Sequence, residues 1–380
     1  MVVIDADGHV EESVQTFIHL EDEWYRRRPI IVEFAHDTVY APWTASWLID
    51  VKTYPNIMGK GGGRLGTPTT SDFAKAKPSS IPSQEITDVA ARLSDLDKAG
   101  IDQQVVYPTL FLMTTTEDVR FEAALYRSYN TFMADACAKS GGRIKYAALV
   151  PIRDLEESVK ELRRAKRLGA SSIMLLGVAW DKNLGDKSLW PFYEEAASLD
   201  IPVCSHFGWG SPAITNVFNS WDRSAGFTSA TLPVMIAFHS VMGSGVLEAI
   251  PNLRFAFLEV GSQWVPWVMH QLRRSGAARK DPADYFREGR VYVACEADED
   301  INHLIAEIGE DGLVVASDFP HSDFSREDNI GTAIMGREDV PLRVREKILS
   351  TNPQRLYGLG SASIGGRGAE TAATGAQTRG

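Results

Sequence analysis

The chain has 380 residues, of which 44% are hydrophobic, so it can bury one large core or the cores of two ordinary domains. Its formal net charge of -11 repels phosphate backbones, and no apolar stretch approaches the ~18 residues of a membrane span, so we expect no nucleic-acid and no membrane partner. The polar residue Asp5 comes too early for a signal peptide and the three cysteines are odd in number, which favours a cytoplasmic protein with reduced thiols.

Short apolar runs recur along the chain, and each is followed by a turn or by a stretch with helical spacing. In Ser83–Ala99, for example, apolar residues stand three and four positions apart. Repeated strand and helix of this size predicts a parallel sheet with right-handed crossovers. Eight repeats are enough to close a barrel, so we predict an α/β fold, a (β/α)8 TIM barrel. The predicted strands are Val2–Asp7, Asp102–Tyr107, Ile144–Val150, Ser171–Leu176, Ile201–His206, Leu253–Glu259, Val291–Glu296 and Leu313–Asp318.

Two regions interrupt this repeat. Residues 10–82 form a long insertion after the first predicted strand, which would place them over the catalytic face of the barrel as a lid. Within them, the glycine-rich segment Gly59–Gly66 predicts a mobile flap, and Arg64 is a candidate contact for an anionic group of a substrate. Residues 361–380 are rich in Gly, Ala, Ser and Thr and are predicted to be disordered. We therefore expect a single barrel domain over residues 1–358.

Metal-binding side chains stand where predicted strands end. Asp7 and His9 are two positions apart, so they point to the same side of the first strand and can reach one ion. His206 ends the fifth predicted strand, and Asp318 ends the eighth. Because the carboxyl ends of all barrel strands share one face, we predict that these four residues bind a metal there.

Four segments resemble the amidohydrolase superfamily: the Asp7–His9 region, SHFG at 205–208, PNLRFAFLEVGSQWVPW at 251–267 and GEDGLVVASDFPHSD at 309–323. More narrowly, they resemble its amidohydrolase-related branch, which includes aminocarboxymuconate semialdehyde decarboxylase and γ-resorcylate decarboxylase. The resemblance spans about residues 1–358. It implies a (β/α)8 barrel and a divalent metal held by the first-strand pair, the fifth-strand histidine and the eighth-strand aspartate, which are the four residues named above.

The chain departs from that branch at strand ends. The first ligand position holds Asp7, where the branch has His or Glu, and the end of strand six holds Glu259, where the branch has a catalytic histidine. Decarboxylation by the usual route therefore loses support. A single ion would be zinc or manganese, and one zinc needs about four ligands, whereas a surplus of carboxylates favours two bridged iron ions. The candidate ligands are Asp7, His9, His206, Glu259, Glu296 and Asp318, with His239 as a further candidate.

Further candidate residues lie close to these positions. His321 follows Asp318 by three residues, where it can orient the metal-bound carboxylate or relay a proton. Trp209 follows His206 by three residues and is a candidate for the wall of a substrate pocket. The candidate catalytic residues are Asp318, Glu259 and His321, and the candidate substrate-binding residues are Trp209, Tyr107 and Arg64.

Two functions stay open from the sequence. The first is a metal-dependent hydrolase or non-oxidative decarboxylase that cleaves a C–C or C–N bond in a small, cyclic or aromatic carboxylate, with Asp318 moving the proton. The alternative is a nonheme diiron monooxygenase that hydroxylates an apolar, terpenoid or polyketide-like substrate, because the glutamates are also compatible with the platensimycin-biosynthesis offshoot of the superfamily. Both enzymes act on a small molecule, and both allow a homo-oligomer.

Overall fold

The computed structural model describes residues 1–61, 63–218, 224–322 and 325–359. The predicted tail at 361–380 and Gly62 of the glycine-rich segment lie outside the described residues. In these described ranges, no helix combines the length and the apolar character that crossing a bilayer requires.

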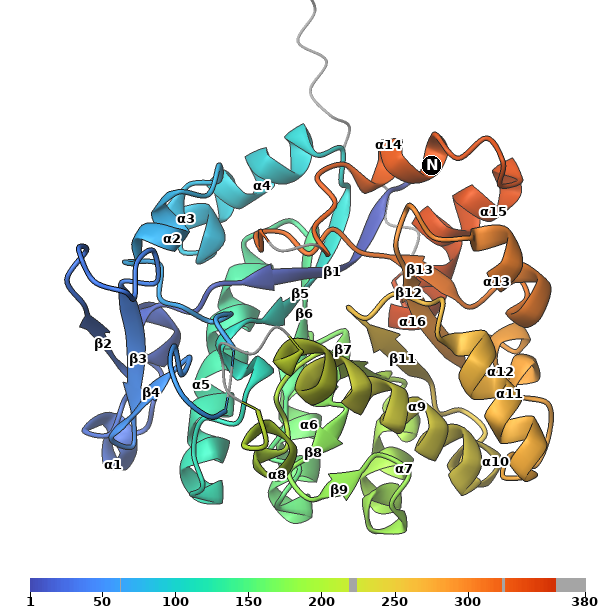
Figure 1. Cartoon of the computed structure of the whole chain (residues 1–380), viewed down its shortest axis with the longest axis horizontal. Helices are drawn as coiled ribbons and strands as arrows, with labels where there is room; N and C mark the ends of the chain where they lie inside the picture. The colour runs from blue at the N-terminus through green and yellow to red at the C-terminus, as the bar shows by residue number, and fades with distance from the viewer. Residues whose placement is uncertain (62, 219–223, 323–324, 360–380) are drawn as a thin grey trace, which may run out of the picture.

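The described residues include an eight-stranded parallel sheet that curls into a nearly closed barrel (Figure 1). Its strand order follows the order along the chain, which is the arrangement of a (β/α)8 barrel. Its strands are almost completely buried, because helices cover their outer faces, and this explains their continuous apolar runs. All eight predicted strands are confirmed: β1 Ile4–Val10, β5 Gln103–Pro108, β6 Ile144–Leu149, β7 Ser172–Leu176, β10 Val203–His206, β11 Phe255–Leu258, β12 Val291–Cys295 and β13 Leu313–Val315.

Helices surround this barrel (Figure 1). The longer ones are α4 Val89–Lys98, α5 Val119–Ala138, α6 Leu155–Arg167, α7 Trp190–Ser198, α9 Leu232–Ser244, α11 Val265–Ser275 and α13 Ile301–Ile308. The shorter ones are α1 Asp22–Tyr25, α2 Asp72–Lys75, α3 Ile81–Gln84, α8 Pro212–Thr215, α10 Val246–Ala249, α12 Pro282–Arg287, α14 Ile330–Met335, α15 Leu342–Glu346 and α16 Asn352–Tyr357.

The helix predicted over Ser83–Ala99 is interrupted. Ile86 has a positive φ of 53°, which ends α3 and its following turn. Asp88 then begins a new helix, because its side chain accepts a hydrogen bond from the backbone N–H of Ala91. The apolar spacing across this stretch was therefore correct for α4, but it did not reveal the break.

The insertion contains a small sheet of its own. β2 Ile30–Glu33, β3 Ala45–Ile49 and β4 Lys52–Tyr54 pair in antiparallel fashion. Trp47 of β3 is buried, and its ring meets that of Phe17 edge-on at 5.5 Å. The sequence predicted an insertion here but not this sheet, since strands of three to five residues show too little alternation to be recognised.

The barrel closes between β1 and β13 through both backbone and side chains. The backbone N–H of Asp318 donates to the carbonyl of Asp7 at 3.0 Å. Two residues before Asp7, the buried carboxylate of Asp5 also joins the two strands. It accepts hydrogen bonds from the backbone N–H and the hydroxyl of Ser317, and it accepts another from the side-chain amide of Gln104. This closure places the first-strand ligand candidates directly beside Asp318.

Asp5→Ala is expected to destabilise the protein by on the order of 3–5 kcal/mol, because buried donors on Ser317 and Gln104 would lose their acceptor. Urea unfolding of the variant and the wild type measures this difference. Asp97→Ala is the matched control, since Asp97 is an exposed carboxylate paired with Arg143 and its loss is expected to change stability by about 1 kcal/mol or less. Equal stability of the two variants would contradict the closing role of Asp5.

Candidate active site

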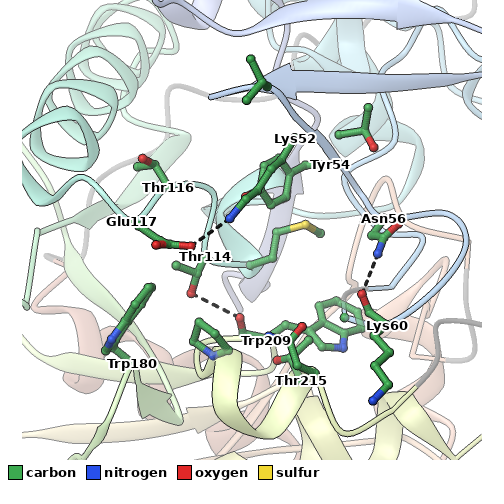
Figure 2. A pocket seen from close by; sticks show the side chains of 16 residues that line it. Lys52, Tyr54, Asn56, Lys60, Thr114, Thr116, Glu117, Trp180, Trp209 and Thr215 are labelled. Carbon is green, nitrogen blue, oxygen red and sulfur yellow. Dashed lines mark hydrogen bonds and ion pairs between the residues drawn. The ribbon is translucent and has the colours of Figure 1, made fainter.

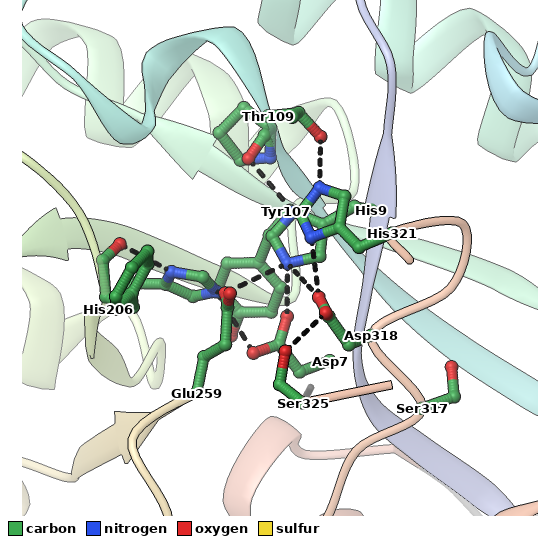
Figure 3. A network of polar contacts seen from close by, with 12 residues as sticks. Asp7, His9, Tyr107, Thr109, His206, Glu259, Ser317, Asp318, His321 and Ser325 are labelled. Carbon is green, nitrogen blue, oxygen red and sulfur yellow. Dashed lines mark hydrogen bonds and ion pairs between the residues drawn. The ribbon is translucent and has the colours of Figure 1, made fainter. Parts of the chain in front are cut away.

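The carboxyl ends of four strands bring histidines and carboxylates to one point (Figure 3). His9 Nε2 lies 3.4 Å from Asp7 Oδ1 and 3.3 Å from Asp318 Oδ1. His206 Nε2 lies 3.0 Å from Asp7 Oδ2. Glu259 Oε2 lies 3.3 Å from Nε2 of both histidines. We call these five residues the cluster; the structure thus brings together the four predicted ligands and Glu259.

Asp7 and His9 converge although β1 is irregular. The register between β1 and β5 shifts between Asp5 and Gly8, so β1 carries one extra residue as a bulge. A Cβ at Gly8 would lie 2.2 Å from the amide nitrogen of Gln104. A larger residue between the two ligand candidates would therefore displace the buried side chain of Gln104 from its hydrogen bond to Asp5, which favours glycine at this position.

Backbone carbonyls determine which nitrogen of each cluster histidine faces the other ligands. His9 Nδ1 lies 3.1 Å from the carbonyl oxygen of Pro108, and His206 Nδ1 lies 2.9 Å from that of Phe207. A carbonyl only accepts, so Nδ1 donates and Nε2 turns its lone pair toward the cluster. Burial, followed by the charges of His321 and His206, lowers the pKa of His9 well below its usual value. His9 is therefore neutral, as a metal ligand must be.

Two cluster carboxylates stand on strained backbone. Glu259 has a φ of 59° and Asp318 a φ of 54°. The left-handed region is uncommon for residues with a Cβ, and it persists only where the surroundings enforce it, often at functional sites. Both residues follow the last residues of barrel strands, so the turn directs their carboxylates toward His9.

A third histidine joins the cluster from the side of Asp318. His321 Nδ1 lies 2.8 Å from Asp318 Oδ1, and its Nε2 lies 3.0 Å from the hydroxyl of Thr109. Its ring stacks on that of His9 with centroids 4.1 Å apart, and the hydroxyl of Ser325 donates to the other oxygen of Asp318. The sequence identified His321 but missed Thr109 and Ser325; the position of Thr109 two residues beyond a predicted strand was the one available signal.

The cluster fits a divalent metal. Ligand atoms of Asp7, His9, His206 and Glu259 all lie within 4.8 Å of one another, as do those of His9, Glu259, Asp318 and His321. Among the described residues, Asp7 Oδ1 and His9 Nε2 are buried without a hydrogen-bond partner, which is unfavourable unless a cation satisfies them. Neutral imidazoles combined with carboxylates are the ligands of zinc, manganese and iron sites.

Two predicted ligands, Glu296 and His239, are not among the converging ligand atoms found in the described residues, and their metal binding stays a prediction. Glu296 follows β12 but belongs to neither group of converging ligand atoms found in the described residues. It is half-buried, and burial together with the charges of Glu299 and Asp298 raises its pKa. His239 is exposed on α9, outside the barrel. A strand end alone does not determine where the next side chain points, and a helix outside the barrel cannot reach its mouth.

Two predicted substrate-binding residues make contacts within the protein. Tyr107 is fully buried, its hydroxyl lies 3.0 Å from that of Tyr357, and its ring centroid is 5.0 Å from that of His206. These contacts argue against the predicted substrate contact and give Tyr107 a packing role beside a cluster histidine. The guanidinium of Arg64 lies 4.2 Å from the centroid of the Trp43 ring, and burial lowers its pKa. Substrate binding by Arg64 stays a prediction.

Two cavities lie among the loops at the carboxyl ends of the strands. The first, of about 480 Å³, is lined by Glu259 and Asp318 together with residues from 294–298 and 325–327. The second, of about 460 Å³, is lined by Trp209 and its neighbours together with insertion residues between 51 and 61 (Figure 2). Both volumes lie in the usual range of small-molecule sites.

Residues 43–359 match the protein family described as Amidohydrolase. The chain belongs to this family. A gamma-resorcylate decarboxylase of Polaromonas sp. is 24% identical to this amidohydrolase over 310 residues, which cover 73% of this chain and 92% of that protein. A 2-amino-3-carboxymuconate-6-semialdehyde decarboxylase of Dictyostelium discoideum is 25% identical over 248 residues, which cover 61% of this chain and 67% of that protein.

Solved structures share the fold of this amidohydrolase. An amidohydrolase from Mycobacterium avium subsp. paratuberculosis superposes with a TM-score of 0.73 at 20% identity, covering 95% of this chain and 98% of that one. A dihydroxybenzoic acid decarboxylase from Polaromonas sp., with bound manganese and an inhibitor, gives a TM-score of 0.59 at 22% identity, covering 72% and 86%. The predicted resemblance is confirmed: the protein is an enzyme of the amidohydrolase superfamily, and the family and the cluster together support a divalent metal.

Gly61 and Gly63 of the glycine-rich segment contact the barrel loops, and the mobile flap expected from the sequence stays a prediction. A Cβ at Gly63 would lie 2.3 Å from a ring carbon of Trp209. Gly61 has a φ of 85°, and its backbone N–H donates to the carbonyl of Phe218 at 3.1 Å. The described glycines therefore allow close approach and a left-handed turn.

Gly63→Ala is expected to displace the insertion from Trp209, because the added methyl group occupies space that the indole ring fills. We expect kcat/KM to fall about 10-fold, since small displacements of a site wall disturb substrate positioning. Gly226→Ala is the matched control, because Gly226 has a φ of -59° and no atom of the described residues lies within 4 Å of its added Cβ. Steady-state kinetics and melting temperatures are measured for both variants and for the wild type. If the kcat/KM of Gly63→Ala equals that of Gly226→Ala, the contact between Gly63 and Trp209 does not position the substrate.

Proposed function

We propose that this amidohydrolase is a metal-dependent, non-oxidative decarboxylase of small aromatic carboxylates. The observation that carries the proposal is the pairing of Asp318 with His321 at 2.8 Å beside the metal-binding cluster. Decarboxylation needs a proton donor next to the bound ring, and this pair can hold and release one. The names of its relatives support the reaction class, since they include gamma-resorcylate decarboxylase and 5-carboxyvanillate decarboxylase.

Cluster residues would hold the metal, with Asp7, His9, His206 and Glu259 as ligands and Asp318 at its border. A bound divalent ion supplies positive charge that orients and polarises a substrate carboxylate or phenolate. Of the two mononuclear candidates, manganese and zinc, we propose manganese. Three carboxylates among five cluster residues favour the harder ion, and a related decarboxylase from Polaromonas sp. has bound manganese.

The proposed chemistry replaces the carboxylate of the substrate with a proton. The ring carbon that bears the carboxylate takes a proton from the Asp318–His321 pair. The C–C bond then breaks, its electron pair returns to the ring, and carbon dioxide leaves. Ser325 and Thr109 hold the two members of the pair by hydrogen bonds of 2.7 Å and 3.0 Å, so the donor keeps its orientation when the proton moves.

Glu259 explains how this chain can lack the histidine expected at the end of strand six. Its carboxylate lies 3.3 Å from Nε2 of both His9 and His206, which is the position of a further ligand. We propose that Glu259 binds the metal and that His321, on the loop after β13, supplies the imidazole for proton transfer. In this proposal the site still contains an imidazole for proton transfer, but the histidine follows strand eight of the barrel and not strand six.

The first cavity and the insertion could together enclose the substrate. We propose that the ring occupies the cavity of about 480 Å³ that Glu259 and Asp318 line, and that residues 10–82 cover the centre as a lid. The diiron monooxygenase alternative was based on a surplus of carboxylates, with Glu296 among them. Because Glu296 does not converge with the described ligand atoms, no specific observation favours that alternative.

Turnover in deuterium oxide tests the proposal. Manganese-loaded enzyme incubated with hydroxylated benzoic acids is expected to release carbon dioxide and to leave one deuterium on the ring carbon that carried the carboxylate. Mass spectrometry and NMR detect both products. A hydrolase would release no carbon dioxide, and a monooxygenase would consume dioxygen and add an oxygen atom. Failure to release carbon dioxide from any acid in the panel would overturn the proposal.

A further inference from the structure

Two histidines of the site contact one short segment at the end of β5 (Figure 3). His9 Nδ1 lies 3.1 Å from the carbonyl oxygen of Pro108, and His321 Nε2 lies 3.0 Å from the hydroxyl of Thr109. Pro108 is the last residue of β5, and Thr109 follows it directly. A shift of this segment would therefore turn both a metal-ligand candidate and the histidine proposed for proton transfer.

A buried carboxylate from the end of β1 holds this segment. Glu12 follows the last residue of β1 by two positions, and it is 3% exposed. The backbone N–H of Thr109 donates to its Oε1 at 3.1 Å, and the backbone N–H of Leu110 donates to its Oε2 at 2.7 Å. Thr109 and Leu110 are fully buried, so their N–H groups depend on an acceptor from the protein. Glu12 provides it.

The acceptor from Glu12 leaves the hydroxyl of Thr109 available for His321. Thr109 precedes the short helical turn η2 Leu110–Leu112. A threonine at this position often accepts a hydrogen bond from a backbone N–H of the turn with its own hydroxyl, but Thr109 makes no such bond. The carboxylate of Glu12 holds the start of the turn instead. The Thr109 hydroxyl can then lie beside the imidazole of His321.

A single peptide unit links Glu12 to His9. The carbonyl of Pro108 and the N–H of Thr109 belong to the same planar unit. Glu12 holds its N–H end, and His9 Nδ1 holds its carbonyl end. Because the unit is rigid, a rotation that breaks one of these bonds also moves the other. An N–H that donates to a carboxylate also polarises the carbonyl of its unit, which strengthens the bond to His9.

We propose that Glu12 is a positioning residue for both halves of the site. Through the peptide unit it orients His9 toward the metal, and through Thr109 it orients His321 for proton transfer. The first half depends only on the metal-binding cluster, whereas the second half rests on the proposed function. Loss of the Glu12 carboxylate should therefore weaken metal binding and slow turnover, while loss of the Thr109 hydroxyl should slow turnover alone.

Manganese titration by calorimetry tests the first half without a substrate, so its result does not depend on decarboxylation. Glu12→Gln keeps the shape of the side chain but has one accepting atom where the carboxylate has two. We expect manganese affinity to fall ~10-fold, the lower range for loss of an outer partner of a metal-bound histidine. Glu161→Gln is the matched control, because Glu161 is 4% exposed and accepts a hydrogen bond from Asn130, which lies outside the cluster. It should lower the melting temperature and bind manganese like the wild type.

Kinetics at saturating manganese test the second half, with a hydroxylated benzoic acid that the wild type decarboxylates. Thr109→Val removes the hydroxyl but keeps the backbone N–H and most of the side-chain shape. It is expected to lower kcat ~10-fold while KM and manganese affinity stay unchanged. Glu12→Gln should also lower kcat. In the double variant, kcat should fall by less than the product of the two single losses, because both changes act on the same histidine.

The two halves fail separately. Unchanged manganese affinity in Glu12→Gln would overturn the positioning of His9, whether or not any acid is decarboxylated. Losses of kcat that multiply in the double variant would overturn the positioning of His321. If Glu12→Gln does not fold, Glu12→Asp replaces it, since aspartate keeps the charge but is one methylene group shorter, and the same outcomes apply.

NMR tests the positioning of His321 even if the wild type decarboxylates no acid, an outcome that would overturn the proposed function. The ring nitrogen resonances of His321 are measured in zinc-loaded enzyme, because zinc is diamagnetic, and are assigned with His321→Gln. They should shift in Glu12→Gln and in Thr109→Val and stay in place in Glu161→Gln. Resonances that move in Thr109→Val but not in Glu12→Gln would overturn the link from Glu12 to His321.

Discussion

Asp318→Asn is expected to lower turnover at least ~100-fold and to leave the fold intact. One oxygen of Asp318 faces both His9 and His321, at 3.3 Å and 2.8 Å, so under the proposed function the carboxylate would bind the metal and assist proton transfer by His321. Asparagine keeps the shape of the side chain but has neither the charge nor the ability to take up a proton. Activity assays of the purified variant measure its turnover, circular dichroism measures whether it is folded, and elemental analysis measures its metal content.

Asparagine is also a favourable choice for the backbone at this position. Asp318 has a φ of 54°, and asparagine tolerates the left-handed region better than most residues, so a loss of activity does not come from backbone strain. Asp298→Asn is the matched control, because Asp298 lines the same cavity but contributes no atom to the converging ligands. Full activity of Asp318→Asn would mean that the site has been assigned wrongly.

The sequence predicted the barrel and the centre of the site for one physical reason. Strands buried on both faces are continuous apolar runs, so the position where each run meets a polar residue is visible in the sequence. In a parallel barrel these positions share one face, and His206 and Asp318 consequently met Asp7 and His9 as expected.

Residues beyond the strand ends were harder to predict, because loop turns determine their direction. Glu259 turns toward the cluster on a left-handed residue, whereas Glu296 follows the next strand and stays outside the converging ligands. Thr109 reaches His321 over 212 positions of sequence, which no local pattern reveals. Gly63 packs against Trp209, which lines the second cavity, and this contact joins segments that are distant in the sequence.

Metal content is the other large expected effect. Protein purified without chelators and loaded with manganese is expected to bind close to one divalent ion per chain. The two groups of converging ligand atoms share His9 and Glu259, so they overlap in a single centre. A count close to two per chain would instead support the dinuclear arrangement that the surplus of carboxylates first indicated.

Glu259→Gln and Glu296→Gln form a matched pair for this measurement, since each replaces one carboxylate at a strand end by an amide of the same shape. Glu259 Oε2 lies 3.3 Å from both cluster histidines, so its replacement is expected to weaken metal binding 10–100-fold. Glu296 lies outside the converging ligands, so Glu296→Gln is expected to bind the metal like the wild type. Titration with manganese, followed by elemental analysis after dialysis, gives the metal affinity of each variant. If Glu296→Gln lost the ion and Glu259→Gln retained it, the assignment of Glu259 as a ligand would be wrong. The carboxylate that binds the metal would then follow β12, strand seven of the barrel, and not strand six.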